Sequence, residues 1–433
     1  MGIKLRKYFL LFFDILFLYL SLYLALFLRH FGKFEIEIFF SHILPFTILF
    51  FIWLIVFYAF GFYDFEFLRT SLIFKTFSVI SLNFVLGVLL FYFVPQFKIA
   101  PKTILILNSL IFGIFFFFLR KFFLSFFSAY LLEKVAILGK DAEVEKLKKE
   151  IKEKPFLGYE LVELDLSKDL LTQIEKEKIG TIVFTEEFEK DPKFQTLFYN
   201  LLFLGKNFLD FPSFYEKILE KIPVTLISKV WFFENLREGE KRIYDRFKRI
   251  FDVVLGSIIL ILTLPIWLII ALAIKLEDRG PVFYIQDRVG KNKKIFKLIK
   301  FRSMILDAEK KGAKWADVKD KRITKVGKII RQLHFDELPQ MINVIKGDIS
   351  LIGPRPERPE FVEKLEKEIP YYNLRHIIKP GFTGWAQIKF RYARSVEDSL
   401  EKFQYDLYYI KNRSLFLDLK ILLKTVNLFF KKE

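Results

Sequence analysis

The chain opens with four long apolar stretches separated by short polar segments. They run approximately over residues 8–28, 44–62, 71–94 and 103–119. About 20 consecutive apolar residues cross the roughly 30 Å hydrocarbon core of a bilayer. The first three stretches approach or exceed that length, and the fourth continues into the aromatic-rich segment 122–132. The pattern predicts an N-terminal four-helix transmembrane bundle over residues 1–133.

Charges inside these stretches are rare, and Asp14 is the clearest. A carboxylate at membrane depth can mark a functional site. Because no series of further charges accompanies it, an interfacial or helix-pairing role is favoured.

The charged flanks of the four stretches indicate an orientation. With the N-terminus in the cytoplasm, the inner flanks hold Lys4, Arg6, Lys7, Arg69, Lys75, Arg120 and Lys121. The outer loops then hold Arg29, Lys33, Lys98 and Lys102. Basic residues accumulate on the cytoplasmic side of membrane proteins. The chain after residue 133 is therefore expected in the cytoplasm.

Residues 134–236 show short apolar runs that alternate with charged segments. Strands are expected at 135–138, 159–166, 180–185 and 207–211, and helices at 141–154, 170–178 and 194–204. This alternation predicts a parallel sheet in a Rossmann-like α/β module. Asp165 could contact a ribose, but the turn Gly139-Lys140-Asp141 has one glycine where the dinucleotide fingerprint has three. A structural or regulatory module is favoured over a cofactor site.

A fifth apolar run covers residues 253–274 and contains Pro265 in its middle. Proline removes a helix hydrogen bond and clashes with the preceding turn. Each half has about 11 residues and a length of about 16 Å, too short to span a bilayer. Basic residues flank both ends (Lys248, Arg249 and Lys275). A re-entrant hairpin over about residues 250–276 is favoured, with the Thr263 hydroxyl as a partner for freed backbone groups. An ordinary kinked fifth span is the alternative.

The last apolar segment, 415–430, repeats its apolar residues every three to four positions. These are Leu415, Leu419, Leu422, Val426 and Phe430. Lysines accompany them (Lys420, Lys424, Lys431 and Lys432). The pattern suits a helix in the headgroup region of a membrane. A helix packed on a domain core is the equal alternative.

Composition agrees with a chain that lies partly in lipid and partly in water. It has 433 residues, 53% of them hydrophobic, with 56 Phe, and 27% of them charged. The absence of cysteine excludes disulfides, thiolate zinc sites and a cysteine nucleophile. Of the net charge of +18, residues 237–433 carry +16. Nucleic acid, anionic lipid headgroups and a nucleotide-sugar are the phosphate-bearing partners that such a charge could serve.

The candidate chemistry lies in this basic part. Asp336 and Glu337 stand side by side in an apolar helix context, followed by the turn Gly353-Pro354-Arg355-Pro356. Adjacent carboxylates on a helix point about 100° apart and can serve different partners. Mg²⁺ favours one or two carboxylates together with substrate phosphates. Further polar candidates come from a predicted hairpin around Gly290 and from the segment after the turn: Gln286, Arg288, Lys300, Arg302 and Arg358.

Several ordered motifs between residues 240 and 433 resemble one family. They are YDRFKRIFDVV, GPVFYIQDRVGKNKKIFKLIKFRSM, RITKVGKIIRQLHFDELPQMINVIKGDISLIGPRPE, KPGFTGWAQI and YDLYYIKNRSLFLDLKILLKT. Together with the proline-broken apolar run, they look like the bacterial sugar transferases, the polyprenyl-phosphate hexose-1-phosphate transferases, in a long form with four N-terminal spans. The pair His334-Phe335 departs from many members. Over residues 1–236 the likeness is architectural only.

The resemblance implies a phosphoglycosyl transferase domain over residues 237–433, mostly α, with Pro265 at the re-entrant break. It implies transfer of a sugar-1-phosphate from a UDP-sugar to undecaprenyl phosphate, with release of UMP, at the start of exopolysaccharide, capsule or O-antigen synthesis. By the resemblance, Asp336 forms an aspartyl-phosphosugar, and Glu337 handles protons or Mg²⁺. Arg302, Arg355 and Arg358 are expected to bind phosphate, with Gln286, Arg288 and Lys300 as further substrate contacts.

The implied setting is the bacterial inner membrane, with the active site on its cytoplasmic face. The expected partners are the UDP-sugar, undecaprenyl phosphate, Mg²⁺ and the bilayer, with no nucleic acid and with a homodimer as in relatives of this layout. A non-catalytic scaffold of polysaccharide assembly is the alternative, and the Asp336–Glu337 pair argues against it. A nucleotide-linked oxidoreductase centred on residues 134–236 is disfavoured by the single-glycine turn.

Overall fold

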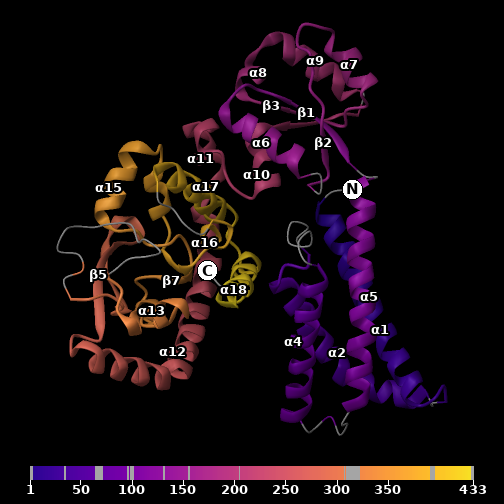
Figure 1. Cartoon of the computed structure of the whole chain (residues 1–433). Coiled ribbons are helices and arrows are strands. Elements are labelled where there is room, and N and C mark those ends of the chain that lie inside the picture. The colour runs from indigo at the N-terminus through magenta and orange to yellow at the C-terminus, as the bar shows by residue number, and fades with distance from the viewer. Residues whose placement is uncertain are drawn as a thin grey trace. The chain divides into compact units, whose positions relative to one another are not determined.

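A computed structural model (Figure 1) describes most of the chain. The described residues are 3–33, 36–63, 72–94, 97, 102–129, 132–154, 157–203, 205–306, 308, 322–390 and 395–430. They form two compact units, Met1–Phe214 and Tyr215–Glu433. The division into three domains at residues 133 and 236 stays a prediction.

The first unit begins with the four expected apolar helices, which pack side by side. They are α1 (Ile3–Arg29), α2 (Ile36–Ala59), α4 (Leu72–Phe93) and α5 (Lys102–Ala129). Each is long and apolar enough to cross a membrane. Their core is aromatic: the ring centroids of Phe57 and Phe116 lie 4.4 Å apart, and those of Phe57 and Phe112 lie 5.6 Å apart. Aromatic packing of this kind contributes much of the contact between the helices.

One buried ion pair joins α1 to α5. The side chains of Asp14 and Arg120 are fully buried, and Arg120 Nη2 donates to Asp14 Oδ2 at 2.6 Å. The Tyr63 hydroxyl donates to the same oxygen at 2.7 Å, and the guanidinium lies 3.7 Å from the ring centroid of Phe116. The helix-pairing role expected for Asp14 is confirmed.

The same pair corrects one element of the orientation argument. Arg120 was counted among the cytoplasmic flank charges, but its side chain lies inside the bundle and is neutralised there by Asp14. Arg69 and Lys98, which the argument also used, lie outside the described residues, as do the side chains of Lys4 and Arg6.

Breaking this pair from one side should destabilise the bundle. In Arg120→Met the Asp14 carboxylate stays buried without its cation, and such a loss costs about 3–5 kcal/mol of folding free energy. The double variant Asp14→Asn/Arg120→Gln should unfold at a temperature closer to wild type, because no charge is left unpaired. Thermal unfolding of the detergent-purified protein measures both, with the exposed Lys121→Met as control. A wild-type melting temperature for Arg120→Met would contradict the expectation.

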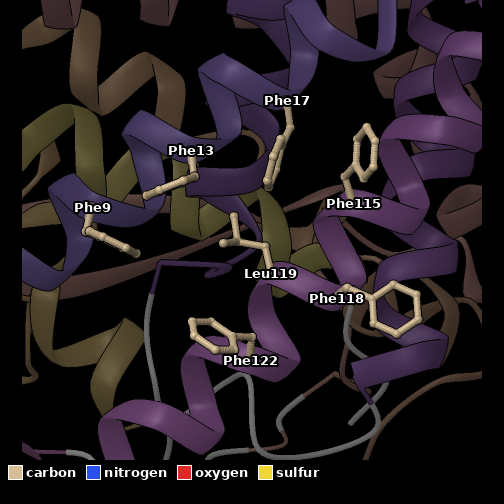
Figure 2. Close-up of a pocket in the computed structure, with 7 residues that line it drawn as sticks. All are labelled: Phe9, Phe13, Phe17, Phe115, Phe118, Leu119 and Phe122. Carbon is tan, nitrogen blue, oxygen red and sulfur yellow. The ribbon is translucent and has the colours of Figure 1, made fainter. Parts of the chain in front are cut away.

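An apolar groove of about 320 Å³ lies between α1 and α5 (Figure 2). Its lining consists of Phe9, Phe13 and Phe17 from α1 and of Phe115, Phe118, Leu119 and Phe122 from α5. Because these side chains offer no hydrogen-bonding group, the groove suits hydrocarbon and not a polar ligand.

The first unit ends with a four-stranded parallel sheet of order β2-β1-β3-β4. Its strands are β1 (Glu133–Leu138), β2 (Tyr159–Leu161), β3 (Thr181–Phe184) and β4 (Asn207–Asp210), and its helices are α6 (Ala142–Glu153), α7 (Leu170–Lys176), α8 (Glu186–Lys190) and α9 (Pro192–Leu202). The predicted parallel sheet is confirmed, although β2 is shorter than the expected strand at 159–166. The Rossmann-like classification stays a prediction.

Packing alone accounts for the glycine in the first turn. A Cβ at Gly139 would lie 2.7 Å from Thr185 Cγ2 and 3.0 Å from Val144 Cγ2. The position therefore needs glycine whether or not a cofactor binds.

The second unit is a mixed α/β structure with a large hydrophobic core and a smaller cluster around Trp267 and Phe301. Its helices are α10 (Phe211–Leu219, which begins in the first unit), α11 (Lys229–Asn235), α12 (Arg242–Asp278), α13 (Lys325–Gln332), α14 (Gln340–Lys346), α15 (Pro359–Glu368), α16 (Trp385–Lys389), α17 (Val396–Asn412) and α18 (Leu415–Phe430). Short 3₁₀ turns lie at η3 (Val224–Leu226), η4 (Glu238–Lys241), η5 (Lys291–Lys293), η6 (Phe335–Glu337) and η7 (Tyr372–His376). The predicted hairpin around Gly290 is confirmed as the antiparallel pair β5 (Phe283–Val289) and β6 (Ile295–Phe301). A second, parallel pair joins β7 (Ser350–Ile352) to β8 (Gly381–Thr383).

Helix α12 contains the proline of the fifth apolar run. Its 37 residues form one helix with Pro265 inside it, and its ribbon changes direction along its length (Figure 1). Proline at 265 leaves the carbonyl of Ile261 without its usual donor, whereas the Thr263 hydroxyl donates to the carbonyl of Ile259 at 2.8 Å. Length and composition also allow this helix to cross a membrane. The re-entrant hairpin stays a prediction.

The exposed side of α12 is strongly apolar. Leu262 and Leu268 are each 71% exposed, while Trp267, Ile270 and Ile274 pack inward against Phe301 and Ile330. An exposed apolar face along a helix indicates a surface that contacts a membrane or a partner protein.

Helix α18 has the predicted bounds but packs through other residues than expected. Leu417, Asp418 and Ile421 are buried, whereas Leu415 and Leu419 of the predicted apolar repeat are each 51% exposed. The side chains of Val426 and Phe430, and residues 431–433, lie outside the described part. The buried side fits the alternative of a helix packed on the domain core.

Candidate functional site

The two candidate acids lie on the short turn η6 and not on an α-helix. His334 adopts a left-handed conformation (φ 55°) after α13, and residues 335–337 then form one 3₁₀ turn before α14. Three residues per turn place adjacent side chains about 120° apart. The expected α-helical context is therefore wrong, but the divergence of Asp336 and Glu337 remains.

Glu337 is held between two cations from different elements. Lys300 Nζ, on β6, donates to Glu337 Oε1 at 2.8 Å, and Arg355 Nη2, in the loop after β7, donates to the same oxygen at 2.5 Å. Burial alone would raise the pKa of Glu337, but Arg355 and Lys300 outweigh it and hold the pKa well below its ordinary value. Glu337 is thus a fixed anion.

Asp336 differs from Glu337 in its contacts and in the direction of its pKa shift. Its side chain is buried, and within the described residues no side-chain hydrogen bond or ion pair reaches its carboxylate. Burial raises the pKa of Asp336 and the charge of Glu337 adds to the rise, whereas Lys300, Arg331 and Arg355 oppose it. A carboxylate that makes no ion pair is suited to react with a ligand, because no ion pair has to be broken first.

The guanidiniums of Arg288, Arg355 and Arg358 lie close enough to one another to interact electrostatically, and Arg355 contacts Glu337. Arg288 Nη2 donates to Gln286 Oε1 at 2.5 Å, and Arg288 Nη1 donates to the carbonyl of Pro356 at 3.0 Å. Burial lowers the pKa of Arg288, and the charges of Arg355 and Arg358 lower it further against the pull of Glu357. Arginines that repel one another in a buried region favour an anion among them, and phosphate oxygens match their geometry.

Like Arg355, which pairs with Glu337, the other two predicted phosphate ligands have carboxylate partners. Arg358 Nη2 lies 3.5 Å from Glu360 Oε1 at the start of α15. Arg302 is buried and donates to Asp278 at the end of α12, and its guanidinium packs so closely on Gly280 that a Cβ there would lie 2.2 Å from Arg302 Nη1. Arg302 therefore ties the β5–β6 hairpin to the long apolar helix. Its phosphate-binding role stays a prediction.

The structure adds a half-buried carboxylate that sequence reasoning missed. Glu357 lies 3.3 Å from Lys402 Nζ and 4.0 Å from Arg375 Nη1. Burial would raise the pKa of Glu357, but Lys402, Arg375 and Arg288 lower it to about 2. No local pattern marks Glu357, because its partner Lys402 is 45 residues away in the sequence.

The donor set fits a divalent cation only with help from a ligand. Within the described residues, no group of three or more acidic or histidine side chains could hold a metal ion. Asp336 and Glu337 offer two carboxylates, and Glu337 Oε2 is only weakly contacted, 3.5 Å from Arg355 Nη1. Mg²⁺ is commonly bound by one or two carboxylates plus substrate phosphates, so the pair fits that arrangement.

Glu337 held as an anion, Asp336 with no side-chain partner among the residues that the structure describes, and a group of arginines lie in one unit with a long apolar helix. Together with the N-terminal apolar helices, they indicate a membrane protein whose second unit carries a group of paired acids and arginines.

Comparison with known proteins gives the family. The model of the bacterial sugar transferase family matches residues 243–432. A putative undecaprenyl-phosphate N-acetylgalactosaminyl 1-phosphate transferase of Bacillus subtilis is 51% identical over 132 residues, which cover 30% of this chain and 74% of that protein. The chain belongs to the bacterial sugar transferase family.

Two longer relatives match the same region. A UDP-N-acetylgalactosamine-undecaprenyl-phosphate N-acetylgalactosaminephosphotransferase of Aeromonas hydrophila is 50% identical over 214 residues, 48% of this chain and 50% of that protein. A UDP-glucose:undecaprenyl-phosphate glucose-1-phosphate transferase of Escherichia coli is 44% identical over 183 residues, 41% of this chain and 39% of that protein. The chain thus matches half or less of the length of these two relatives.

Proposed function

We propose that this protein transfers a sugar-1-phosphate from a UDP-sugar to undecaprenyl phosphate, with release of UMP, through a covalent intermediate on Asp336. The observation that carries the proposal is the contrast between the two acids. Glu337 is fixed by Lys300 and Arg355, while Asp336 beside it is buried and unpaired within the described residues. The relatives named for such transfers support the substrate class.

The reaction needs two displacements at one phosphorus atom. A carboxylate oxygen of Asp336 attacks the sugar-bearing phosphate of the UDP-sugar, and the bond from that phosphorus to the bridging oxygen breaks, so that UMP leaves. A phosphate oxygen of undecaprenyl phosphate then attacks the same phosphorus and breaks its bond to Asp336. The products are a sugar-diphospho-lipid and the regenerated carboxylate. Covalent catalysis lets a soluble and a lipid substrate react in turn at one site.

The surrounding residues supply electrostatic stabilisation. Arg355, Arg288 and Arg358 would bind the phosphate oxygens of the donor, and Lys300 would hold Glu337 and offset charge near Asp336. Fixed donors of this kind stabilise the charge that develops during transfer. Mg²⁺, held by Asp336, Glu337 and donor phosphates, would neutralise charge on those phosphates.

The apolar helices support a membrane setting for the proposed reaction. We infer that the exposed apolar face of α12 lies in the bilayer, where it brings the acid pair close to the phosphate of the lipid acceptor. The setting in this proposal is the cytoplasmic face of the bacterial inner membrane, where the product would begin an exopolysaccharide, capsule or O-antigen.

A panel of UDP-sugars tests the proposal. Purified protein with undecaprenyl phosphate and Mg²⁺ should release UMP from at least one donor, and label from that sugar should enter the lipid fraction. UDP-N-acetylgalactosamine and UDP-glucose come first, because the relatives are named for them. Chelation of Mg²⁺ by EDTA should stop both readouts, and added Mg²⁺ should restore them. Absence of UMP release with every donor would contradict the proposal.

A further inference from the structure

The loop that carries Arg355 is held by hydrogen bonds that its backbone carbonyls accept. The carbonyl of Arg355 accepts from Arg375 Nη2 at 2.9 Å. The carbonyl of Pro356 accepts from Arg288 Nη1 at 3.0 Å, and that of Glu357 accepts from the amide of Val289 at 3.0 Å. Three consecutive carbonyls are therefore fixed by three separate donors.

Carbonyl contacts matter here because prolines flank Arg355. Pro354 and Pro356 have no amide hydrogen, so neither can fix the loop by donating a backbone hydrogen bond. The orientation of the peptide after Arg355 then depends mainly on what its carbonyl accepts. That peptide sets where the Arg355 side chain leaves the backbone, and this side chain contacts Glu337 at 2.5 Å.

Arg375 is built into the fold as a rigid donor. It lies on η7, is only 4% exposed, and its Nη2 also donates to Asp406 Oδ2 on α17 at 2.8 Å. Its Nη1 donates to the Tyr372 hydroxyl at 2.7 Å. A buried guanidinium is tolerated only when paired, and Asp406, equally buried, supplies that charge. The planar fork reaches carbonyl, carboxylate and phenol together, which a lysine ammonium would do with less fixed geometry.

We propose that Arg375, held by Asp406, is a positioning residue for the transfer reaction. It fixes the Arg355 carbonyl and thereby keeps the Arg355 guanidinium on Glu337. Its recorded contacts are with the back of the loop and with η7 and α17, and none is with Asp336 or Glu337 in the described residues. The inference rests on the proposed function, because its readout is the rate of transfer.

The chain offers a matched control in Arg413. Arg413 is buried like Arg375; it bridges Glu238 and Asp245 and donates to the carbonyl of Ile410 at 3.1 Å. It thus makes the same kinds of contact away from the Arg355 loop. We expect Arg375→Lys and Arg413→Lys to lower the melting temperature to a similar extent.

The two variants should differ in catalysis. A misplacement of about 1 Å in a catalytic group costs about 100-fold in rate, so kcat of Arg375→Lys should fall about 10- to 100-fold, and that of Arg413→Lys should stay near wild type. Equal kcat values for the two variants would overturn the inference. Loss of transfer in the wild type itself would instead overturn the proposed function, and the two failures are therefore distinct.

A double variant tests the route through Arg355. If Arg375 acts through Arg355, adding Arg375→Lys to Arg355→Ala should change kcat little, because residues that act as a unit are not additive. A full additional 10- to 100-fold loss in that background would contradict the route.

Should Arg375→Lys fail to fold, Tyr372→Phe tests the inference instead, because it removes one hydrogen bond to the Arg375 guanidinium. A decrease in kcat of about fivefold is then expected, and wild-type kcat would overturn the inference.

Discussion

Asp336→Asn is expected to lose transfer of sugar phosphate while the protein stays folded. An amide cannot attack phosphorus as the carboxylate does, and removal of a nucleophile costs about a thousandfold or more in kcat. Both UMP release and lipid labelling should fall together. Asp287→Asn is a suitable control, because Asp287 lies on β5 in an exposed pair with Lys297. Transfer above a tenth of the wild-type rate in Asp336→Asn would contradict the assignment.

The same variant should not lose stability at neutral pH. Burial raises the pKa of Asp336 in the folded protein, so folding favours the neutral acid. The stability that this shift contributes is present below the ordinary aspartate pKa and is lost as pH rises through the folded value. At pH 7 the buried charge costs free energy that asparagine does not. The melting temperature of Asp336→Asn should therefore equal or exceed that of wild type at pH 7, and this difference should shrink in acid.

Glu337→Gln is expected to lower kcat by about 100-fold and also to destabilise the protein. Glutamine leaves Lys300 and Arg355 without their shared anion, and the Arg355 guanidinium then loses its fixed place near the phosphates. Loss of fixed electrostatic donors typically costs about 100- to 1000-fold in kcat. Charge-assisted hydrogen bonds contribute about 1.5–3 kcal/mol each, so unfolding should need less denaturant.

The pH dependence of this destabilisation has the opposite sign to that of Asp336→Asn. Arg355 and Lys300 overcome the effect of burial and lower the pKa of Glu337 in the folded state. The stability that Glu337 contributes is present above the ordinary glutamate pKa and is lost as pH falls through the lowered value. Denaturant titrations at neutral and acid pH should show the deficit of Glu337→Gln at neutral pH and a smaller one in acid. A deficit that is equal at both pH values would show that the ion pairs do not hold Glu337.

Much of the architecture could be predicted from local pattern. The four apolar helices, the strands of the parallel sheet and the hairpin around Gly290 follow from periodicity and turn residues, which act over a few positions. The acid pair and Arg355 were also found, because they cluster within 20 residues of sequence. Lys300 was expected as a substrate contact; the structure shows its ion pair with Glu337, and the substrate contact stays a prediction.

What could not be predicted depends on distant partners. Arg120 appeared to be a flank charge because its partner Asp14 is 106 residues away. Arg375 and Asp406 are 31 residues apart in sequence, and only the fold brings them together next to the Arg355 loop. The partner of a buried charge is set by the fold, and residues adjacent in sequence do not identify it.

The most direct test of the central claim is the mass of the protein after exposure to the UDP-sugar that it uses, without lipid acceptor. The account predicts about one UMP released per protein molecule and an adduct of one sugar phosphate on the peptide that contains Asp336. This adduct should be absent from Asp336→Asn and should be discharged by undecaprenyl phosphate. An unmodified protein that releases UMP only when the lipid is present would contradict the covalent mechanism.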